Sequence, residues 1–218
     1  YSKPVFSPKG KLLGHAAVGS RKDIRNAVEA AQAATGWAKA SAHLRAQILY
    51  YVGENLSARA DEFAARIVGL TGTTVSKAEA EVTEAIDTIF TFAAWCDKLD
   101  GAAKPVPMRG VALAMNEPVG VIGAFCDDRP LGGLIDVIAP AIAMGNRVVA
   151  VASAAYPLAA TDFYQVLDTS DLPAGVVNIL MGAHADLAPT MAGHMNIDAV
   201  WSFSSADISQ TIETQRAG

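Results

Sequence analysis

The 218-residue sequence contains few cysteines, few charged residues and few aromatic residues. Two cysteines, Cys96 and Cys126, are too few for a disulfide framework, so we expect a reducing, cytoplasmic setting. Only 18% of the residues are charged, and 17 basic against 22 acidic side chains include no Lys/Arg cluster, so we expect no nucleic-acid partner. No apolar run approaches the roughly 18 residues of a membrane span, and we expect no membrane association.

Apolar residues are abundant instead and make up 51% of the chain. This share, together with a net charge of only −5, excludes a disordered chain. A chain of this length buries roughly 70% of its unfolded surface and therefore forms a core without disulfides or metals. We expect one large domain or two small ones.

The first hundred residues show mainly a helical pattern. Ser20 followed by Asp23 resembles a capping box, and apolar residues then recur at helical spacing up to Gly36, where we expect this helix to end. A second capping-box-like string begins at Ser76 and predicts a long helix that ends at Gly101. Two further helices are expected between these, one from about residue 41 and one over residues 60–68.

Beyond residue 110, apolar runs alternate with helical segments. Strands buried on both faces appear as continuous apolar runs, and we expect four of them, at 119–125, 147–151, 176–180 and 199–203. Helices separate these runs, so the sequence predicts an α/β fold with a parallel, Rossmann-like sheet flanked by helices. We divide the chain into a helical segment at 1–110 and a sheet-containing segment at 111–218 that pack as one domain.

Four motifs, in order along the chain, resemble the aldehyde dehydrogenase superfamily. They are the helical stretch 27–45, EPVGVIG at 117–123, APAIAMGNRVV at 139–149, and LPAGVVNI at 172–179 followed by Gly182. The resemblance covers nearly the whole chain and implies the family's N-terminal, coenzyme-binding part, with NAD or NADP as cofactor. It also implies that strand-like pieces near residues 4–18 and 104–116 belong to an oligomerisation flap.

The resemblance implies a reaction for which this chain lacks the catalytic groups. The family attacks the aldehyde with a Cys thiolate, uses a Glu base, and stabilises the oxyanion with an Asn and backbone donors. The motifs that carry the Cys and the Glu are absent here, and the turn that holds the Asn is replaced by CDDRP at 126–130. We therefore assign no catalytic residue and no metal ligand.

The family's cofactor ligands are also replaced. A Lys and a Glu that hold the ribose correspond to Val151 and Ala154, and both glycines of the pyrophosphate turn correspond to serines, Ser204 and Ser209. A Cβ at these two positions obstructs the close approach of a phosphate to the backbone amides. Family position leaves four cofactor-binding candidates: Ser153, Gly182, Ser204 and Ser205.

Several residues admit both a functional and a structural interpretation. Cys126 is either a nucleophile or a buried structural thiol, and Asp127 with Asp128 is either a metal or acid–base pair or a solvated pair neutralised by Arg129. Ser204 and Ser205 either contact a phosphate or cap the last helix. The structural interpretation is favoured each time, and His184 and His194 are expected on the surface of one helix.

The losses together most resemble the degenerate second module of two-module aldehyde dehydrogenases of the family-sixteen type. Such a module keeps the fold, binds NAD(P) weakly or not at all, and serves a structural role. Its expected partner is a catalytic aldehyde dehydrogenase module or a second copy of itself. The alternative is the front fragment of an active NAD(P)-dependent aldehyde dehydrogenase whose Cys and Glu lie beyond residue 218.

Overall fold

A four-stranded parallel sheet lies at the centre of the computed structural model, which describes residues 1–99 and 101–216. The strand order is β7-β6-β5-β8, and every neighbouring pair is parallel. The strands are β5 (Val121–Phe125), β6 (Arg147–Val151), β7 (Val177–Leu180) and β8 (Ala199–Ser202). The predicted sheet is thus confirmed. The last two residues of the predicted second segment, 217 and 218, lie outside the described residues.

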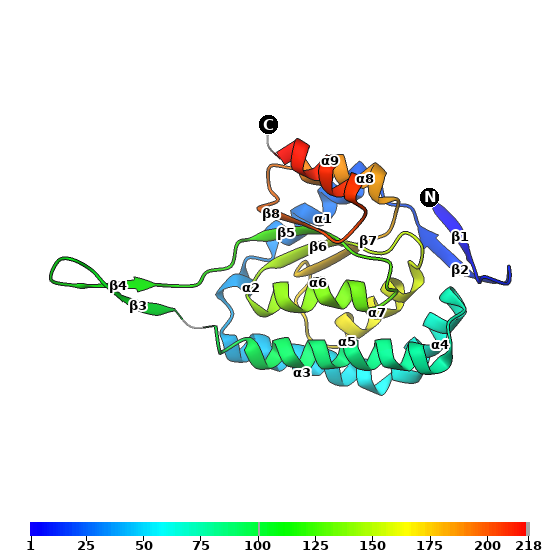
Figure 1. Ribbon diagram of the computed structural model, residues 1–218, viewed down its shortest axis with the longest axis horizontal. Helices are drawn as coiled ribbons and strands as arrows, with labels where there is room; N and C mark the ends of the chain where they lie inside the picture. Colours follow the sequence, from blue (N-terminus) through cyan, green and yellow to red (C-terminus); the bar gives the residue numbers. More distant parts are fainter. Residues whose placement is uncertain (100, 217–218) are drawn as a thin grey trace.

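Helices cover both faces of the sheet (Figure 1). Alternate side chains of β5 point to opposite sides, so Val121 and Phe125 pack with α1 (Arg21–Ala33) and α8 (His184–Ala192), whereas Ile122 belongs to the core around α6 (Gly132–Ala143). On the face covered by α1 and α8, α9 (Ala206–Arg216) lies beside α8. On the opposite face, α7 (Leu158–Asp168) lies on the same side of the sheet as α6. Burial on both faces explains the mainly apolar sequences of the central strands β5 and β6.

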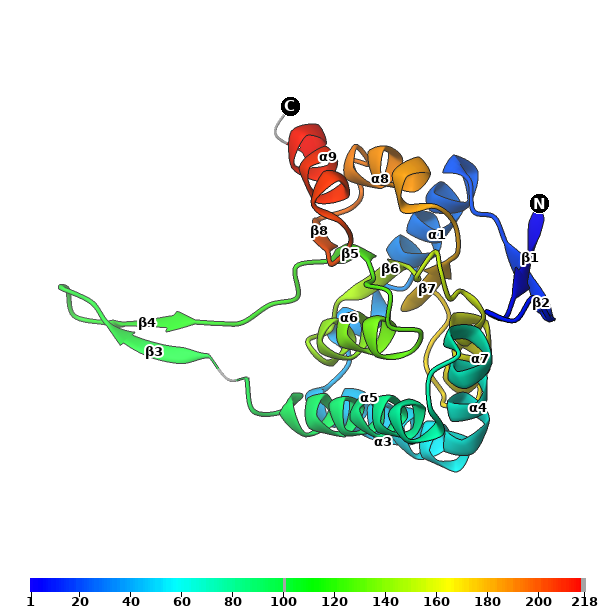
Figure 2. The ribbon, with the colours of Figure 1, turned by 45° about the vertical axis from the view of Figure 1, so that its right-hand side comes forward.

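The N-terminal helices add a further layer beyond α6 (Figure 2). This layer consists of α3 (Ala42–Ala58), α4 (Ala60–Thr71) and α5 (Val75–Trp95), and the short α2 (Gly36–Lys39) precedes it in the chain. Here α3 and α5 pack together, and α5 packs on α6. Among the described residues, no helix is long and apolar enough to cross a membrane.

The observed helix ends differ from the expected ones at several places. Helix α5 ends at Trp95, before the expected end at Gly101, and α4 continues to Thr71, beyond the expected residue 68. Helix α1 ends at Ala33, and Gly36 opens α2 instead of ending the first helix. Helix α5 begins before Ser76, because Thr74 caps it: its hydroxyl accepts a hydrogen bond from the Lys77 backbone N–H at 3.4 Å. The expected start of α1 is correct, since the Asp23 carboxylate accepts from the backbone N–H of Ser20 at 2.8 Å.

Two antiparallel hairpins lie at opposite ends of the molecule (Figures 1 and 2). One pairs β1 (Ser2–Phe6) with β2 (Leu12–Ala17), and the other pairs β3 (Ala102–Pro105) with β4 (Val111–Ala114). The expectation that both pieces share one flap is therefore wrong for the described part of this chain. The β3–β4 hairpin stands away from the helices and the sheet.

Candidate functional site

A crevice of about 570 Å³ opens at the carboxyl edge of the sheet. The segments that follow all four parallel strands contribute to it, which is where ligands bind in open α/β sheets. Its lining residues are Cys126, Asp127, Asp128, Ala154, Ala183, His184, Ala185, Phe203, Ser204, Ser205 and Ile208. This crevice is the candidate site.

The crevice brings together two of the four cofactor-binding candidates. Ser204 and Ser205 line it, whereas Ser153 and Gly182 are buried beside it. The Ser153 hydroxyl donates to the Asp128 carboxylate at 2.9 Å and accepts from the backbone N–H groups of Ala155 and Tyr156. Its hydrogen-bonding capacity is thus used within the turn after β6.

The acidic residues at the crevice mouth are held by neighbouring side chains. Arg129 donates to the Asp127 carboxylate at 2.8 Å and to the Asp136 carboxylate at 2.6 Å. The hydrogen bonds that Arg129 donates to Asp127, and then the one that it donates to Asp136, raise the pKa of Arg129 above its ordinary value. Asp128 is exposed. Within the described ranges, no group of three or more His, Cys, Asp or Glu residues is arranged to hold a metal ion.

Both cysteines are buried thiols. Cys126 forms part of the crevice wall but is 1% exposed, and burial, followed by the charges of Asp127 and Asp136, raises its pKa far above the ordinary value. Burial raises the pKa of Cys96 to about 11. A thiolate is the reactive form of cysteine, so neither side chain has the properties of an activated nucleophile.

His184 is a residue of the site that the sequence analysis did not assign. It opens α8, and its half-buried side chain faces the crevice. His194 lies beyond the end of that helix, so the expectation that one helix carries both histidines is wrong. The Nδ1 atom lies 2.9 Å from the Ser204 hydroxyl, and Nε2 lies 2.9 Å from the Ala152 carbonyl oxygen. The ring also packs edge-on against Phe125, with 5.3 Å between centroids. One sequence signal was available, because His184 follows shortly after the third predicted strand, at the carboxyl edge.

The lining of this crevice lacks the ribose ligands that the resemblance implies for a dinucleotide. Those ligands are a lysine and a glutamate after the second strand, beside a glycine turn whose backbone amides approach the pyrophosphate. The described lining contains no Lys or Arg, and Ala154 has no polar side chain. Val151 is fully buried in the core beside α8. Ser209, at the position of the second replaced glycine, shares a hydrogen bond of 2.8 Å with Ser202 of β8.

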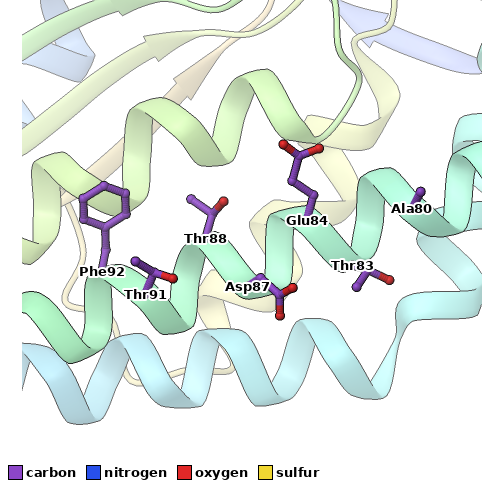
Figure 3. A pocket seen from close by; sticks show the side chains of 7 residues that line it. All are labelled: Ala80, Thr83, Glu84, Asp87, Thr88, Thr91 and Phe92. Carbon is purple, nitrogen blue, oxygen red and sulfur yellow. The ribbon is translucent and has the colours of Figure 1, made fainter.

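A second hollow lies along α5 (Figure 3). Its lining comes from that helix alone, and the side chains are Ala80, Thr83, Glu84, Asp87, Thr88, Thr91 and Phe92. Helix α6 lies between α5 and the sheet (Figure 2). The hollow is therefore a surface groove, separate from the strand ends.

The parallel sheet, the helices on both faces and the crevice at its carboxyl edge define a doubly wound α/β fold of the dinucleotide-binding type. The family model "Aldehyde dehydrogenase family" matches residues 2–218. The chain belongs to the aldehyde dehydrogenase family, an oxidoreductase family, as the motifs predicted.

Curated relatives share about a quarter to a third of the residues. The chain is 28% identical over 215 residues to aldehyde dehydrogenase family 2 member B4, mitochondrial, of Arabidopsis thaliana, covering 96% of this chain and 40% of that protein. It is 29% identical over 212 residues to cytosolic 10-formyltetrahydrofolate dehydrogenase of Mus musculus, covering 93% and 24%. The chain thus spans less than half the length of these relatives.

Solved structures confirm the predicted fold. Betaine aldehyde dehydrogenase from Staphylococcus aureus in complex with NAD+ superposes with a TM-score of 0.94 at 22% identity, covering 99% of this chain and 44% of that one. An aldehyde dehydrogenase from Brucella melitensis biovar abortus 2308 superposes with a TM-score of 0.95 at 25% identity, covering 100% and 46%.

Proposed function

We propose that this chain is a coenzyme-domain module of an aldehyde dehydrogenase family protein that does not oxidise aldehydes by itself. It binds NAD or NADP weakly or not at all, and its role is structural. It resembles the degenerate second module of the family-sixteen type, with residues 1–110 and 111–218 packing as the two parts of one coenzyme domain. The observation that carries the proposal is the crevice, whose described lining contains no Lys or Arg and has Ala154 at the position of the family's ribose-binding Glu.

The size of the effect follows from two missing ribose contacts. A charge-assisted hydrogen bond contributes roughly 1.5–3 kcal/mol, so two of them contribute roughly 3–6 kcal/mol. At about 1.4 kcal/mol per tenfold change, their loss weakens binding by about a hundred- to ten-thousand-fold. The carboxylates of Asp127 and Asp128 at the mouth act in the same direction, because they repel a pyrophosphate.

A calorimetric titration of the chain with NAD and with NADP tests this proposal. We expect no saturable heat at micromolar nucleotide and no NADH formation with any aldehyde. The double change Val151→Lys with Ala154→Glu restores the family's ribose ligands and raises the affinity. Because Val151 is buried, the single change Ala154→Glu serves as a second variant, and Ala155→Glu, on the exposed neighbour, is its matched control.

Two outcomes contradict the proposal. Micromolar NAD binding by the unaltered chain shows that the crevice accepts the nucleotide. It favours the alternative of a front fragment of an active NAD(P)-dependent enzyme, an alternative that rests on the relatives being more than twice as long as the matched region. Equal affinities of the Ala154→Glu and Ala155→Glu variants show that position 154 does not face the ribose.

The structural role is supported by the β3–β4 hairpin. An isolated two-stranded ribbon is at best marginally stable, and both of its edges have unpaired backbone groups. Its apolar side chains are strongly exposed, with Met108 at 77%, Val111 at 69%, Leu113 at 69% and Met115 at 71%. We infer that this hairpin pairs with a second copy of the chain or with a catalytic module.

The mass of the chain in solution tests the pairing with a second copy. Light scattering after size exclusion should give a multiple of 22.7 kDa. Leu113→Lys should shift it toward the monomer, because a charge replaces an apolar contact, while Leu12→Lys on the other hairpin should leave it unchanged. A monomeric unaltered chain excludes the second copy and leaves the catalytic module as the proposed partner.

A further inference from the structure

Ser204 and His184 form a hydrogen-bonded pair inside the crevice, and aldehyde oxidation has no use for it. The two side chains come from different elements, Ser204 from the turn before α9 and His184 from the start of α8. Their Oγ and Nδ1 atoms lie 2.9 Å apart, and both residues line the 570 Å³ crevice. A serine beside a histidine in an accessible crevice is the arrangement of an activated nucleophile.

The Ala152 carbonyl determines which imidazole nitrogen carries the hydrogen. A carbonyl oxygen can only accept, so the Nε2 atom, 2.9 Å away, must donate to it. In the neutral ring, Nδ1 then has a free lone pair and accepts the hydrogen of the Ser204 hydroxyl. A third group thus orients the base, as in established nucleophile–base–orienter arrangements.

We propose that Ser204 and His184 form an acyl-transfer site that hydrolyses small carboxylic esters. This activity needs no nucleotide and is independent of the proposed structural role. Ser204 is the nucleophile, His184 is the general base, and the Ala152 carbonyl orients the imidazole.

The reaction proceeds in two balanced halves. The Ser204 oxygen bonds to the ester carbonyl carbon while its proton moves to Nδ1 of His184; the bond from carbon to the alcohol oxygen then breaks, and the alcohol leaves with that proton. Water attacks the acyl-Ser204 carbonyl and gives a proton to Nδ1. The bond to Ser204 breaks, the proton returns to the serine oxygen, and the carboxylic acid is released. The sum is ester plus water to acid plus alcohol.

The surroundings of the Ser204–His184 pair supply hydrogen-bond donors for the oxyanion and carboxylates that disfavour anionic substrates. Helix α9 begins at Ala206, directly after the turn that carries Ser204, and the Ser205 carbonyl accepts the first helical bond, from Ser209. The amide groups of this first turn have no acceptor within the helix, and they point back toward that turn. Asp127 and Asp128 line the same crevice, so neutral or cationic esters are favoured over anionic ones.

Cys126 is the competing nucleophile in this crevice. Its side chain is 1% exposed and remains a thiol, whereas Ser204 is only half-buried and already hydrogen-bonded to a base. The two assignments predict acylation at different residues, which peptide mass spectrometry separates.

The experiment incubates the full chain with p-nitrophenyl acetate and follows p-nitrophenolate release, with peptide mass spectrometry to locate the acetyl group. We expect acetyl-Ser204 in the unaltered chain. Ser204→Ala should abolish it, and His184→Gln should lower the rate by at least about 100-fold, the usual contribution of a general base. Ser57→Ala is the matched control, since this exposed serine of α3 lies outside the crevice, and its rate should be unchanged.

Rescue by added imidazole distinguishes a general base from a merely structural hydrogen bond. If His184 is the base, the His184→Gly variant should regain acetyl-Ser204 formation when imidazole is added, and the Ser204→Ala variant should not. Melting temperatures of all variants show that they are folded. The cationic ester acetylcholine should react and an anionic ester such as acetylsalicylate should not. Acetylation at Cys126 or at lysines, an unchanged rate in Ser204→Ala, or the absence of rescue by imidazole each overturns the proposal.

Discussion

Replacing Gly120 by alanine should destabilise the entry to the central strand by a predictable amount. Gly120 immediately precedes β5 and has a φ of +135°, a conformation that residues with a Cβ avoid. An added Cβ would lie 2.0 Å from a carboxylate oxygen of Asp198, and that oxygen accepts the backbone N–H of Val121 at 2.7 Å. Alanine therefore strains the backbone and displaces the acceptor of a hydrogen bond.

The two effects have separate magnitudes. Backbone strain of this kind costs about 1–3 kcal/mol, and a lost hydrogen bond at a half-exposed site costs about 1 kcal/mol, which together give roughly 2–4 kcal/mol. Urea unfolding of the Gly120→Ala and unaltered chains measures the difference. Gly36→Ala is the control, because its Cβ would meet nothing within 4 Å and its φ lies outside the left-handed region. Its cost should be smaller.

A double-mutant cycle separates the clash from the strain. In the Asp198→Ala background the carboxylate is absent, so Gly120→Ala should cost only the strain of about 1–3 kcal/mol. A cost for Gly120→Ala below about 0.5 kcal/mol would refute the reasoning. Equal costs in both backgrounds would show that the contact with Asp198 contributes nothing.

Two further predictions concern the core. Phe163→Ala should lower the free energy of unfolding by about 3–5 kcal/mol, because this ring is 1% exposed, whereas Tyr164→Ala at 46% exposure should stay within about 1 kcal/mol. Since the pKa of Cys96 is raised to about 11 and an unfolded thiol ionises at about 8.5, folding stability should fall as the pH rises through that interval. Cys96→Ala should reduce this fall in urea unfolding, and an identical pH dependence in both chains would contradict the assignment.

The sheet could be predicted because its physical causes are local in the sequence. The two central strands, β5 and β6, are buried on both faces and are therefore mainly apolar, and Gly145 with a φ of +84° marks the turn before β6. The spacing of four such runs with helical segments between them leaves few alternatives to a parallel sheet. The strand boundaries were accordingly accurate to two residues.

The site could be predicted only in part, because its contacts join distant segments. His184 lies 20 residues from Ser204 and 32 from Ala152, and nothing in the local sequence shows that its ring turns inward. The helices between the two hairpins likewise determine that β1–β2 and β3–β4 lie at opposite ends of the molecule. Sequence spacing identified which residues reach the carboxyl edge, while packing decides which of them face the crevice.

Val151 connects the proposed loss of nucleotide binding with the stability of the fold. Its side chain is fully buried among Phe125, Leu187 and their neighbours, at the position where the resemblance predicts a lysine for the ribose. Burying a valine side chain contributes about 1.5–3 kcal/mol, whereas a lysine there must extend its ammonium group to water or lose its charge. A module released from nucleotide binding therefore gains stability by changing this residue. It follows that Val151→Lys should lower the free energy of unfolding even where, together with Ala154→Glu, it raises the affinity for NAD. A graft that gained affinity with no loss of stability would show that position 151 had adapted to something other than the core.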